Sequence, residues 1–176
     1  MESAREALLS TGDPEEDARA MLDRYWSLAS QAPIPVDPIF IARELGLDVY
    51  VAPLEQGVGG MLVNQPGKQP TIYVSADDHR NRQRFTCAHE LGHWMKRAGN
   101  GSDWAFVDRR DQLSGRGTDP SERYANAFGA ALLMPADAVR ALAGRMSVEA
   151  MARHFAVSPQ AMGLRLTNLN LLPVQR

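Results

Sequence analysis

Two histidines spaced four residues apart, His89 and His93, constrain this 176-residue chain more than any other feature. On an α-helix, side chains four residues apart lie on the same face, one turn above the other. Two neutral imidazoles placed in this way can hold one metal ion and leave its other coordination positions open. Glu90 is turned by about 100° around the helix axis from His89. The pattern therefore predicts a helix through residues 86–93, with a carboxylate beside a metal ion rather than on it.

The spacing His-Glu-x-x-His is typical of zinc hydrolases, in which the glutamate acts as a base for a bound water. Five residues alone also match by chance, so the rest of the chain has to support the interpretation. Imidazole and carboxylate ligands suit Zn²⁺, and Mn²⁺ or Fe²⁺ would bind them too. The motif predicts a zinc site with Glu90 next to it.

Composition excludes several classes of protein. The hydrophobic share of 44% and the charged share of 23% are ordinary for a globular chain. A net charge of −2 does not suggest a protein that binds nucleic acid or an anionic membrane. Cys87 is the only cysteine, so no intrachain disulfide is possible and a cytoplasmic location is expected. Residues 1–10 do not resemble a signal peptide, and no run approaches the ~20 apolar residues of a membrane helix.

Helix starts and short strands alternate in the first half of the chain. Asp13-Pro14 and Asp37-Pro38 each place a capping carboxylate before a proline, which predicts two helices. Runs rich in β-branched and aromatic residues follow. The strands are expected at residues 47–52, 61–63 and 71–74, and a turn-rich loop joins the last two. These segments predict a small antiparallel sheet.

Helices dominate the second half. A helix capped by Asp77 or Asp78 is expected to continue to about Arg97, with His-Glu-x-x-His in its middle. Residues 99–120 are polar and rich in glycine, which predicts a long loop that could control access to the metal. Further helices are expected to begin at Ser121, near Pro135, at Ser147 and at Ser158.

The predicted fold is α+β: a helical bundle with a small antiparallel sheet, and the helix with the metal motif between them. We expect a main domain over residues 1–146 and a helix-turn-helix-like segment over residues 147–176. From Ser147 onward the charged residues sum to a formal +2 without a basic stripe; they are Glu149, Arg153, Arg165 and Arg176. This favours packing against the main domain, or protein docking, over DNA binding.

A catalytic zinc ion usually has three protein ligands and one water, so one ligand is missing from the motif. The metzincin pattern would place a histidine six residues after His93, where this chain has Gly99. Another histidine could serve, and His79 and His154 are the two that remain. Glu122 is the better candidate, because two histidines and a glutamate form a known catalytic set.

Glu122 lies 29 residues after His93, at the expected start of the next helix. That separation allows a helix end, a loop and an antiparallel return. A carboxylate at a helix start can also serve only the helix dipole. Asn126 lies one turn beyond Glu122 on the same face, where it could hydrogen-bond a ligand histidine or a nearby backbone group.

Two stretches resemble the motifs of one family. Residues 84–93, R-F-T-C-A-H-E-L-G-H, resemble the R-F-T-x-A-H-E-L-G-H signature of the ImmA/IrrE family of zinc metallopeptidases. Residues 122–135, E-R-Y-A-N-A-F-G-A-A-L-L-M-P, resemble its second motif, E-x-x-A-N-x-F-A-A-x-L-L-M-P. Cys87 replaces an aliphatic residue and Gly129 replaces alanine, whereas the four site positions are intact. The resemblance extends from about Pro35 to Leu172.

The resemblance implies a gluzincin-like site with Glu122 as the third ligand and Glu90 as the catalytic base. Glu90 would accept a proton from zinc-activated water and pass it to the leaving amine. Tyr124, Arg123 or a residue of the 99–120 loop could stabilise the oxyanion. Characterised relatives cleave a helix-turn-helix repressor encoded beside them. The expected function is therefore endoproteolysis of such a repressor, belonging to a phage, a mobile element or a stress regulon.

Two other functions compete with this one. The chain could be a non-proteolytic binding component of a toxin–antitoxin or phage module, with a structural metal ion. An intact Glu90 argues against that alternative, because a structural site needs no adjacent base. The other interpretation, a DNA-binding regulator, is supported only by the terminal helices.

Overall fold

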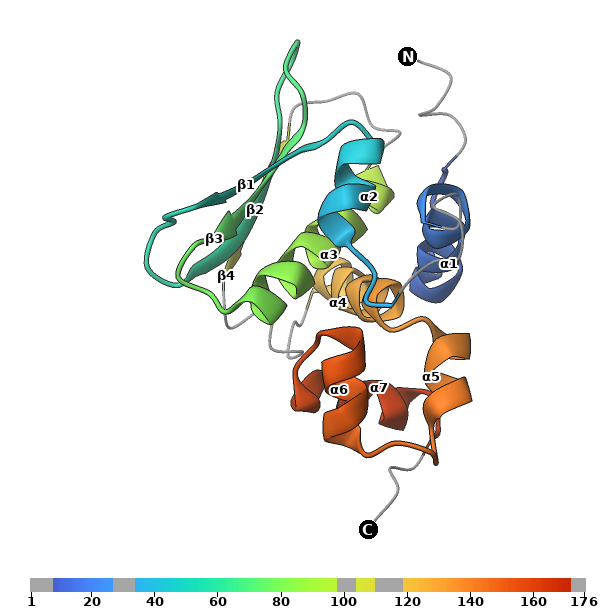
Figure 1. Ribbon diagram of the computed structural model, residues 1–176. Coiled ribbons are helices and arrows are strands. Elements are labelled where there is room, and N and C mark those ends of the chain that lie inside the picture. Colours follow the sequence, from blue (N-terminus) through green and yellow to red (C-terminus); the bar gives the residue numbers. More distant parts are fainter. Residues whose placement is uncertain (1–7, 27–33, 98–103, 110–118, 172–176) are drawn as a thin grey trace.

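Figure 1 shows the computed structural model, which describes residues 8–26, 34–97, 104–109 and 119–171. These residues form seven helices and one four-stranded sheet. The α+β fold class predicted from the sequence is confirmed. None of the helices in the described ranges is long and apolar enough to cross a membrane.

The sheet is mixed, not purely antiparallel as predicted. Its strands are β1 (Asp48–Ala52), β2 (Val58–Asn64), β3 (Thr71–Ser75) and β4 (Trp104–Arg109), in the order β1-β3-β2-β4. Strand β2 pairs antiparallel with both β3 and β4, whereas β1 pairs parallel with β3. Strands β1 and β2 follow each other along the chain but do not pair. The β2–β3 hairpin places β3 between them. This arrangement makes β1 and β3 run in the same direction.

Strand β4 lies inside the stretch that was predicted to be a long loop. Its backbone pairs with β2, from Asn64↔Trp104 to Val58↔Arg109. The short run Trp104-Ala105-Phe106-Val107 favours a strand, but polar and glycine-rich neighbours mask this signal in the sequence. Asp119 and Pro120, at the end of the predicted loop, belong to the start of the next helix, and the suggested control of access concerns residues outside the described ranges.

The two helices predicted to begin at Asp-Pro pairs are confirmed. Helix α1 (Pro14–Tyr25) is capped by Asp13, and α2 (Pro38–Glu44) is capped by Asp37. Each carboxylate accepts hydrogen bonds from two backbone N–H groups of the first turn. Proline at the first helical position costs no hydrogen bond, so both starts are encoded locally.

Two caps differ from the prediction. Helix α3 (Arg80–Arg97) begins after Asp77 and Asp78, and the Nδ1 atom of His79 accepts a hydrogen bond from the Asn81 N–H. Helix α4 (Pro120–Leu133) is capped by Asp119 rather than Ser121, because Pro120 takes the first helical position. Helices α5 (Ala136–Leu142), α6 (Val148–Phe155) and α7 (Pro159–Asn168) follow, the last two capped by Ser147 and Ser158 as predicted.

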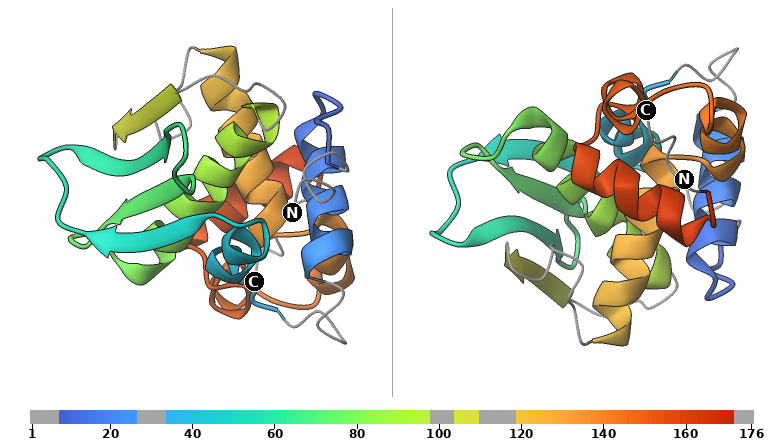
Figure 2. Two further views of the ribbon diagram at one scale, coloured as in Figure 1. Left: turned by 90° about the horizontal axis from the view of Figure 1, so that it is seen from above. Right: turned by 90° about the horizontal axis from the view of Figure 1, so that it is seen from below.

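Helix α3 is the centre of the molecule. It lies between the sheet and α4, and α1 lies beyond α4, as the views in Figures 1 and 2 show. Residues 86–95 of α3 are all buried. Leu62, Ile72 and Val74 of the sheet join the same core as Phe128 and Leu132 of α4. The metal motif therefore sits in the best-packed part of the fold.

The turn between α6 and α7 is attached to the first part of α3. Arg84 donates from Nε to the Ala156 carbonyl at 3.3 Å and from Nη2 to the Val36 carbonyl at 2.7 Å. Asn81 donates to the Val157 carbonyl at 3.3 Å. Burial lowers the pKa of Arg84, against the opposing effect of Asp37, yet the guanidinium stays charged. These bonds fix the terminal helix pair against the main body.

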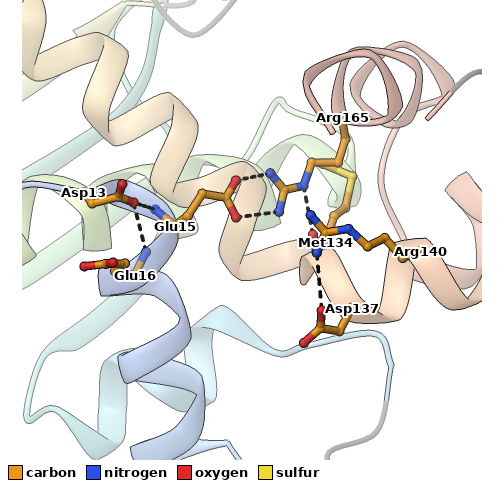
Figure 3. A network of polar contacts seen from close by, with 7 residues as sticks. All are labelled: Asp13, Glu15, Glu16, Met134, Asp137, Arg140 and Arg165. Carbon is orange, nitrogen blue, oxygen red and sulfur yellow. Dashed lines mark hydrogen bonds and ion pairs between the residues drawn. The ribbon is translucent and has the colours of Figure 1, made fainter. Parts of the chain in front are cut away.

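A buried arginine makes a second attachment, drawn in Figure 3. Arg165 of α7 donates to both carboxylate oxygens of Glu15 on α1. Its Nε also donates to the Met134 carbonyl at 3.0 Å, at the end of α4. A paired, hydrogen-bonded guanidinium is tolerated inside a protein. The contact joins α1, α4 and α7. The proposed boundary between a main domain and a terminal segment at residue 146 stays a prediction.

Candidate metal centre

Three ligand-type side chains converge where α3 meets α4. His89 and His93 come from adjacent turns of α3, and Glu122 comes from the first turn of α4. All three are buried, with 0%, 1% and 8% of their surfaces exposed. Of the described residues, these form the group whose ligand atoms could hold one metal ion. His79 and His154, the other histidines considered from the sequence, are exposed and lie outside this group.

The spacing of the ligand atoms suits zinc. The Nε2 atoms of His89 and His93 are 3.1 Å apart. Oxygens of Glu122 lie 3.3 Å from Nε2 of His89 and 3.1 Å from Nε2 of His93. Bonds of about 2.0–2.1 Å at tetrahedral angles place neighbouring ligand atoms roughly 3.4 Å apart. The three side chains therefore match one tetrahedral ion with a fourth position left open.

The outer nitrogens of both imidazoles have partners that orient the rings. Nδ1 of His89 lies 3.0 Å from Oδ1 of Asn126, and Nδ1 of His93 lies 3.4 Å from Oγ of Ser121. An amide oxygen accepts, so His89 carries its proton on Nδ1 and directs the lone pair of Nε2 inward. The contact between Asn126 and a ligand histidine, anticipated from the sequence, is present.

The donor set itself indicates a cation. Two imidazole nitrogens and a carboxylate converge on one small, buried space. Without a positive charge these electron-rich atoms repel one another at such distances, and burial weakens screening by water. A divalent cation converts this repulsion into coordination. Zinc suits this set, whereas calcium and magnesium prefer ligand sets made of oxygen.

Removing the amide of Asn126 is expected to weaken metal binding without destroying the site. We expect Asn126→Ala to lower zinc affinity by about 10–100-fold, the usual cost of losing an outer partner of a ligand histidine. Asn126→Asp, which keeps an acceptor at that position, should retain more of the affinity. Competition with a chromophoric chelator measures both values. An unchanged affinity in Asn126→Ala would show that this contact does not orient His89.

Two glycines allow the ligand helices to touch. A Cβ on Gly92 would lie 2.9 Å from the Ala125 Cα atom, and one on Gly129 would lie 3.2 Å from the His89 backbone nitrogen. Gly92 therefore faces residue 125 while His89 faces residue 129, so the helices run antiparallel, as expected from the sequence. Close backbone packing fixes the distance between the histidines and Glu122.

Glu90 is placed beside the ligands and not among them. Its side chain is fully buried, with 0% of its surface exposed. A Cβ on Gly60 of β2 would come within 2.7 Å of its Oε1 atom, so the strand passes directly over the carboxylate. Sequence reasoning did not find Gly60. Gly60 directly precedes the strand expected at residues 61–63, and nothing in the sequence connects it to Glu90.

Tyr124 does not face the ligand group through its hydroxyl. The hydroxyl donates to the Asp17 carboxylate on α1 and lies 3.4 Å from Oγ of Ser10. Tyr124 is two residues after Glu122, about 200° around the helix. The oxyanion role suggested for Tyr124 therefore has no support in this geometry. Arg123, the other named candidate, is exposed.

The contact of Tyr124 with Asp17 belongs to a partly buried polar cluster that includes Ser10 and Thr11. Burial opposes the charge on Asp17, but hydrogen bonds from Ser10, Tyr124 and Thr11 outweigh it and lower the pKa of this carboxyl. Burial and the adjacent Asp17 raise the pKa of the Tyr124 hydroxyl. The tyrosine thus stays protonated and connects the start of the chain to α4.

Cys87 is part of the core rather than of the metal centre. It is fully buried on α3, and burial together with the nearby Glu90 raises the pKa of its thiol. A protonated, inaccessible thiol is a poor nucleophile and a poor ligand. The residue therefore acts as a small apolar side chain.

Comparison with known families decides what kind of centre this is. The sequence profile of the IrrE N-terminal-like domain, a metallopeptidase family, matches residues 42–167. The chain belongs to this family. The matched region contains α3 and α4 complete, and with them every residue of the candidate centre. A search of curated proteins found no significant match.

Membership in the IrrE-like family confirms the resemblance seen in the sequence and makes the chain a metallopeptidase. It also agrees with the buried His89, His93 and Glu122 group. The individual roles of these residues, and of Glu90 and Asn126, remain predictions. The experiments below test them.

Proposed function

We propose that this protein is a zinc-dependent endopeptidase that cleaves a helix-turn-helix transcriptional repressor. The observation that carries the peptidase assignment is the buried convergence of His89, His93 and Glu122, with Glu90 beside it. A structural zinc site would be closed by a fourth protein ligand, whereas the part of the chain that the structure describes supplies three. An open position next to a carboxylate is the arrangement that hydrolysis requires.

In this proposal His89, His93 and Glu122 hold the zinc ion. When bound, zinc supplies a Lewis acid that polarises a peptide carbonyl and lowers the pKa of water toward ~7. Glu90 takes up the proton released by the attacking water and delivers it to the leaving amine. Asn126 keeps His89 in the tautomer that presents Nε2. His89, Glu90, His93 and Glu122 are buried, which strengthens the electrostatic interactions among them.

The repressor substrate is proposed from the resemblance between this chain's motifs and those of repressor-cleaving relatives. The enzyme and a repressor would share the cytoplasm. A chain with a single cysteine, and therefore no intrachain disulfide, is compatible with that reducing compartment. Cleavage would release transcription of a phage, a mobile element or a stress regulon. We assign no direct binding of nucleic acid to the terminal helix pair. Its turn is bonded to Arg84 and Asn81, and Arg165 of α7 faces Glu15.

The proposal is tested by incubating the zinc-loaded protein with the purified repressor encoded beside its gene. Discrete repressor fragments are expected, and mass spectrometry then locates the cleaved bond. The matched control is the same protein after chelation and dialysis, which should leave the repressor intact until zinc is restored. A stable complex without fragments would overturn the proposal in favour of a binding component of a regulatory module.

A further inference from the structure

Gly60 of β2 lies against the helix that carries the metal motif. A Cβ at this position would lie 2.3 Å from Cγ2 of Thr86, 2.7 Å from Oε1 of Glu90 and 3.4 Å from the Tyr73 carbonyl oxygen. The first two separations are far below ordinary contact between non-bonded atoms. No residue other than glycine fits here without a movement of β2, Thr86 or Glu90.

The need for glycine is one of space and not of backbone conformation. Five described glycines have a positive φ angle, which other residues seldom adopt, but Gly60 is not among them. Gly60 is paired with Val74 of β3 and with Asp108 of β4, so it sits in the interior of the sheet. Glycine inside a strand weakens the sheet, and it often marks a place where another group approaches the backbone closely. Here the close approach is to Glu90.

The irregular pairing of β2 occurs at the same place. The register between β2 and β4 shifts between Val58 and Gly60, which is the signature of a β-bulge. A bulge increases local twist and changes how a strand approaches its neighbours. In this fold it coincides with the point at which β2 passes over Thr86 and Glu90, both of which have 0% of their surface exposed.

We propose that Gly60 is a positioning residue for Glu90: the bare backbone of β2 confines the carboxylate at the side of the metal ligands. A glutamate side chain has several rotatable bonds, and its reach would otherwise allow the carboxylate to swing away. Close approach of β2 and full burial in the core restrict that movement. This inference rests on the proposed function, in which Glu90 handles the proton.

A methyl group at residue 60 is expected to displace the carboxylate while the metal ligands stay in place. Gly60→Ala also meets the Thr86 methyl, so Thr86→Ser provides the reference background that removes this closer contact. In that background, Gly60→Ala should lower kcat by about 100-fold, the effect of a displacement of roughly 1 Å at a reacting group. KM and zinc affinity should stay within about twofold of the Thr86→Ser reference.

Gly163→Ala is the matched control substitution. Gly163 lies on α7 with no atom within 4 Å of its would-be Cβ. The Gly163→Ala substitution adds the same methyl group in open space, and the kcat of this variant should equal that of the unsubstituted protein. Equal kcat for the Thr86→Ser protein with and without Gly60→Ala would overturn the proposal, as would a zinc affinity that falls as it does in Glu122→Ala.

A second measurement does not depend on catalysis. In the Thr86→Ser background, Gly60→Ala should lower the thermal unfolding midpoint by roughly 3–10 °C, because overpacking a core is costly. Combining it with Glu90→Ala, which removes the carboxylate, should recover most of that loss. Combining it with Glu90→Gln, which has the same size, should recover none. Additive effects in the Glu90→Ala combination would show that residue 60 does not contact Glu90.

The two arms separate failure of this inference from failure of the proposed function. If the zinc-loaded protein cleaves no repressor at all, the stability cycle still reports whether Gly60 confines Glu90. If cleavage occurs but the cycle is additive, the peptidase assignment stands and the positioning role of Gly60 is wrong.

Discussion

Glu90→Gln is expected to abolish cleavage of the repressor while the protein keeps its zinc. An amide has the size of the carboxylate but cannot accept the proton released by the attacking water. General acid–base catalysis typically contributes 10²–10⁴-fold, so kcat should fall by at least about 100-fold. Timed digestion of the repressor, followed by electrophoresis, measures the rate. Atomic absorption on the same samples measures the zinc content.

Glu90→Asp is the informative companion variant. It keeps the charge but withdraws the carboxylate by one methylene, so its rate should lie between those of the native and Gln proteins. Zinc content should be equal in all three proteins, since Glu90 lies outside the group of residues that could hold the metal. Cleavage by Glu90→Gln at the native rate would remove Glu90 from the role of base. Loss of zinc in the same variant would instead make it a ligand.

Glu122→Ala is expected to release the metal. Its carboxylate lies within 3.3 Å of both imidazole nitrogens, and its removal leaves two protein ligands. The loss of zinc affinity should exceed the about 10–100-fold typical of an outer hydrogen-bond partner. Cleavage should be lost with the metal. Isothermal titration of the metal-free protein with zinc provides the affinity.

Glu122 could also act only by placing negative charge at a helix start. Glu149→Ala provides the control for that alternative, because Glu149 lies in the first turn of α6 and is exposed. Loss of a dipole interaction costs about 0.3–1 kcal/mol at an exposed site, so this variant should lose a little stability and no zinc. A Glu122→Ala protein with unchanged zinc stoichiometry would show that Glu122 is not a ligand.

The features that local chemistry determines could be predicted from the sequence. Asp13 and Asp37 act on N–H groups two and three residues away, so the helix starts that they specify require no knowledge of the fold. The same holds for His89 and His93, whose spacing fixes their common face. Glu122 could be predicted as a candidate because a catalytic zinc ion usually has three protein ligands, and few side chains in the chain were suitable as the third.

The features that depend on distant neighbours were missed. The direction of β1 depends on where β3 inserts, and no residue of β1 encodes that choice. Strand β4 requires the edge of β2 as its partner. Tyr124 was one of the candidates for stabilising the oxyanion, but its hydroxyl donates to Asp17, a residue 107 positions earlier. The requirement for glycine at residue 60 comes from its proximity to Glu90, and the two residues are brought together only when β2 packs over α3.

The backbone contacts of Gly92 and Gly129 affect how mutational data on this protein should be interpreted. A side chain at residue 92 would push α3 and α4 apart, because its Cβ would lie 2.9 Å from the Ala125 Cα atom, and the histidines would then no longer reach Glu122. Such a variant would lose its metal although every ligand is intact. A genetic screen for metal-free protein should therefore recover substitutions of Gly92 together with those of the ligands. Even alanine at residue 129, the residue of the family motif, would need α3 to yield by a few tenths of an ångström.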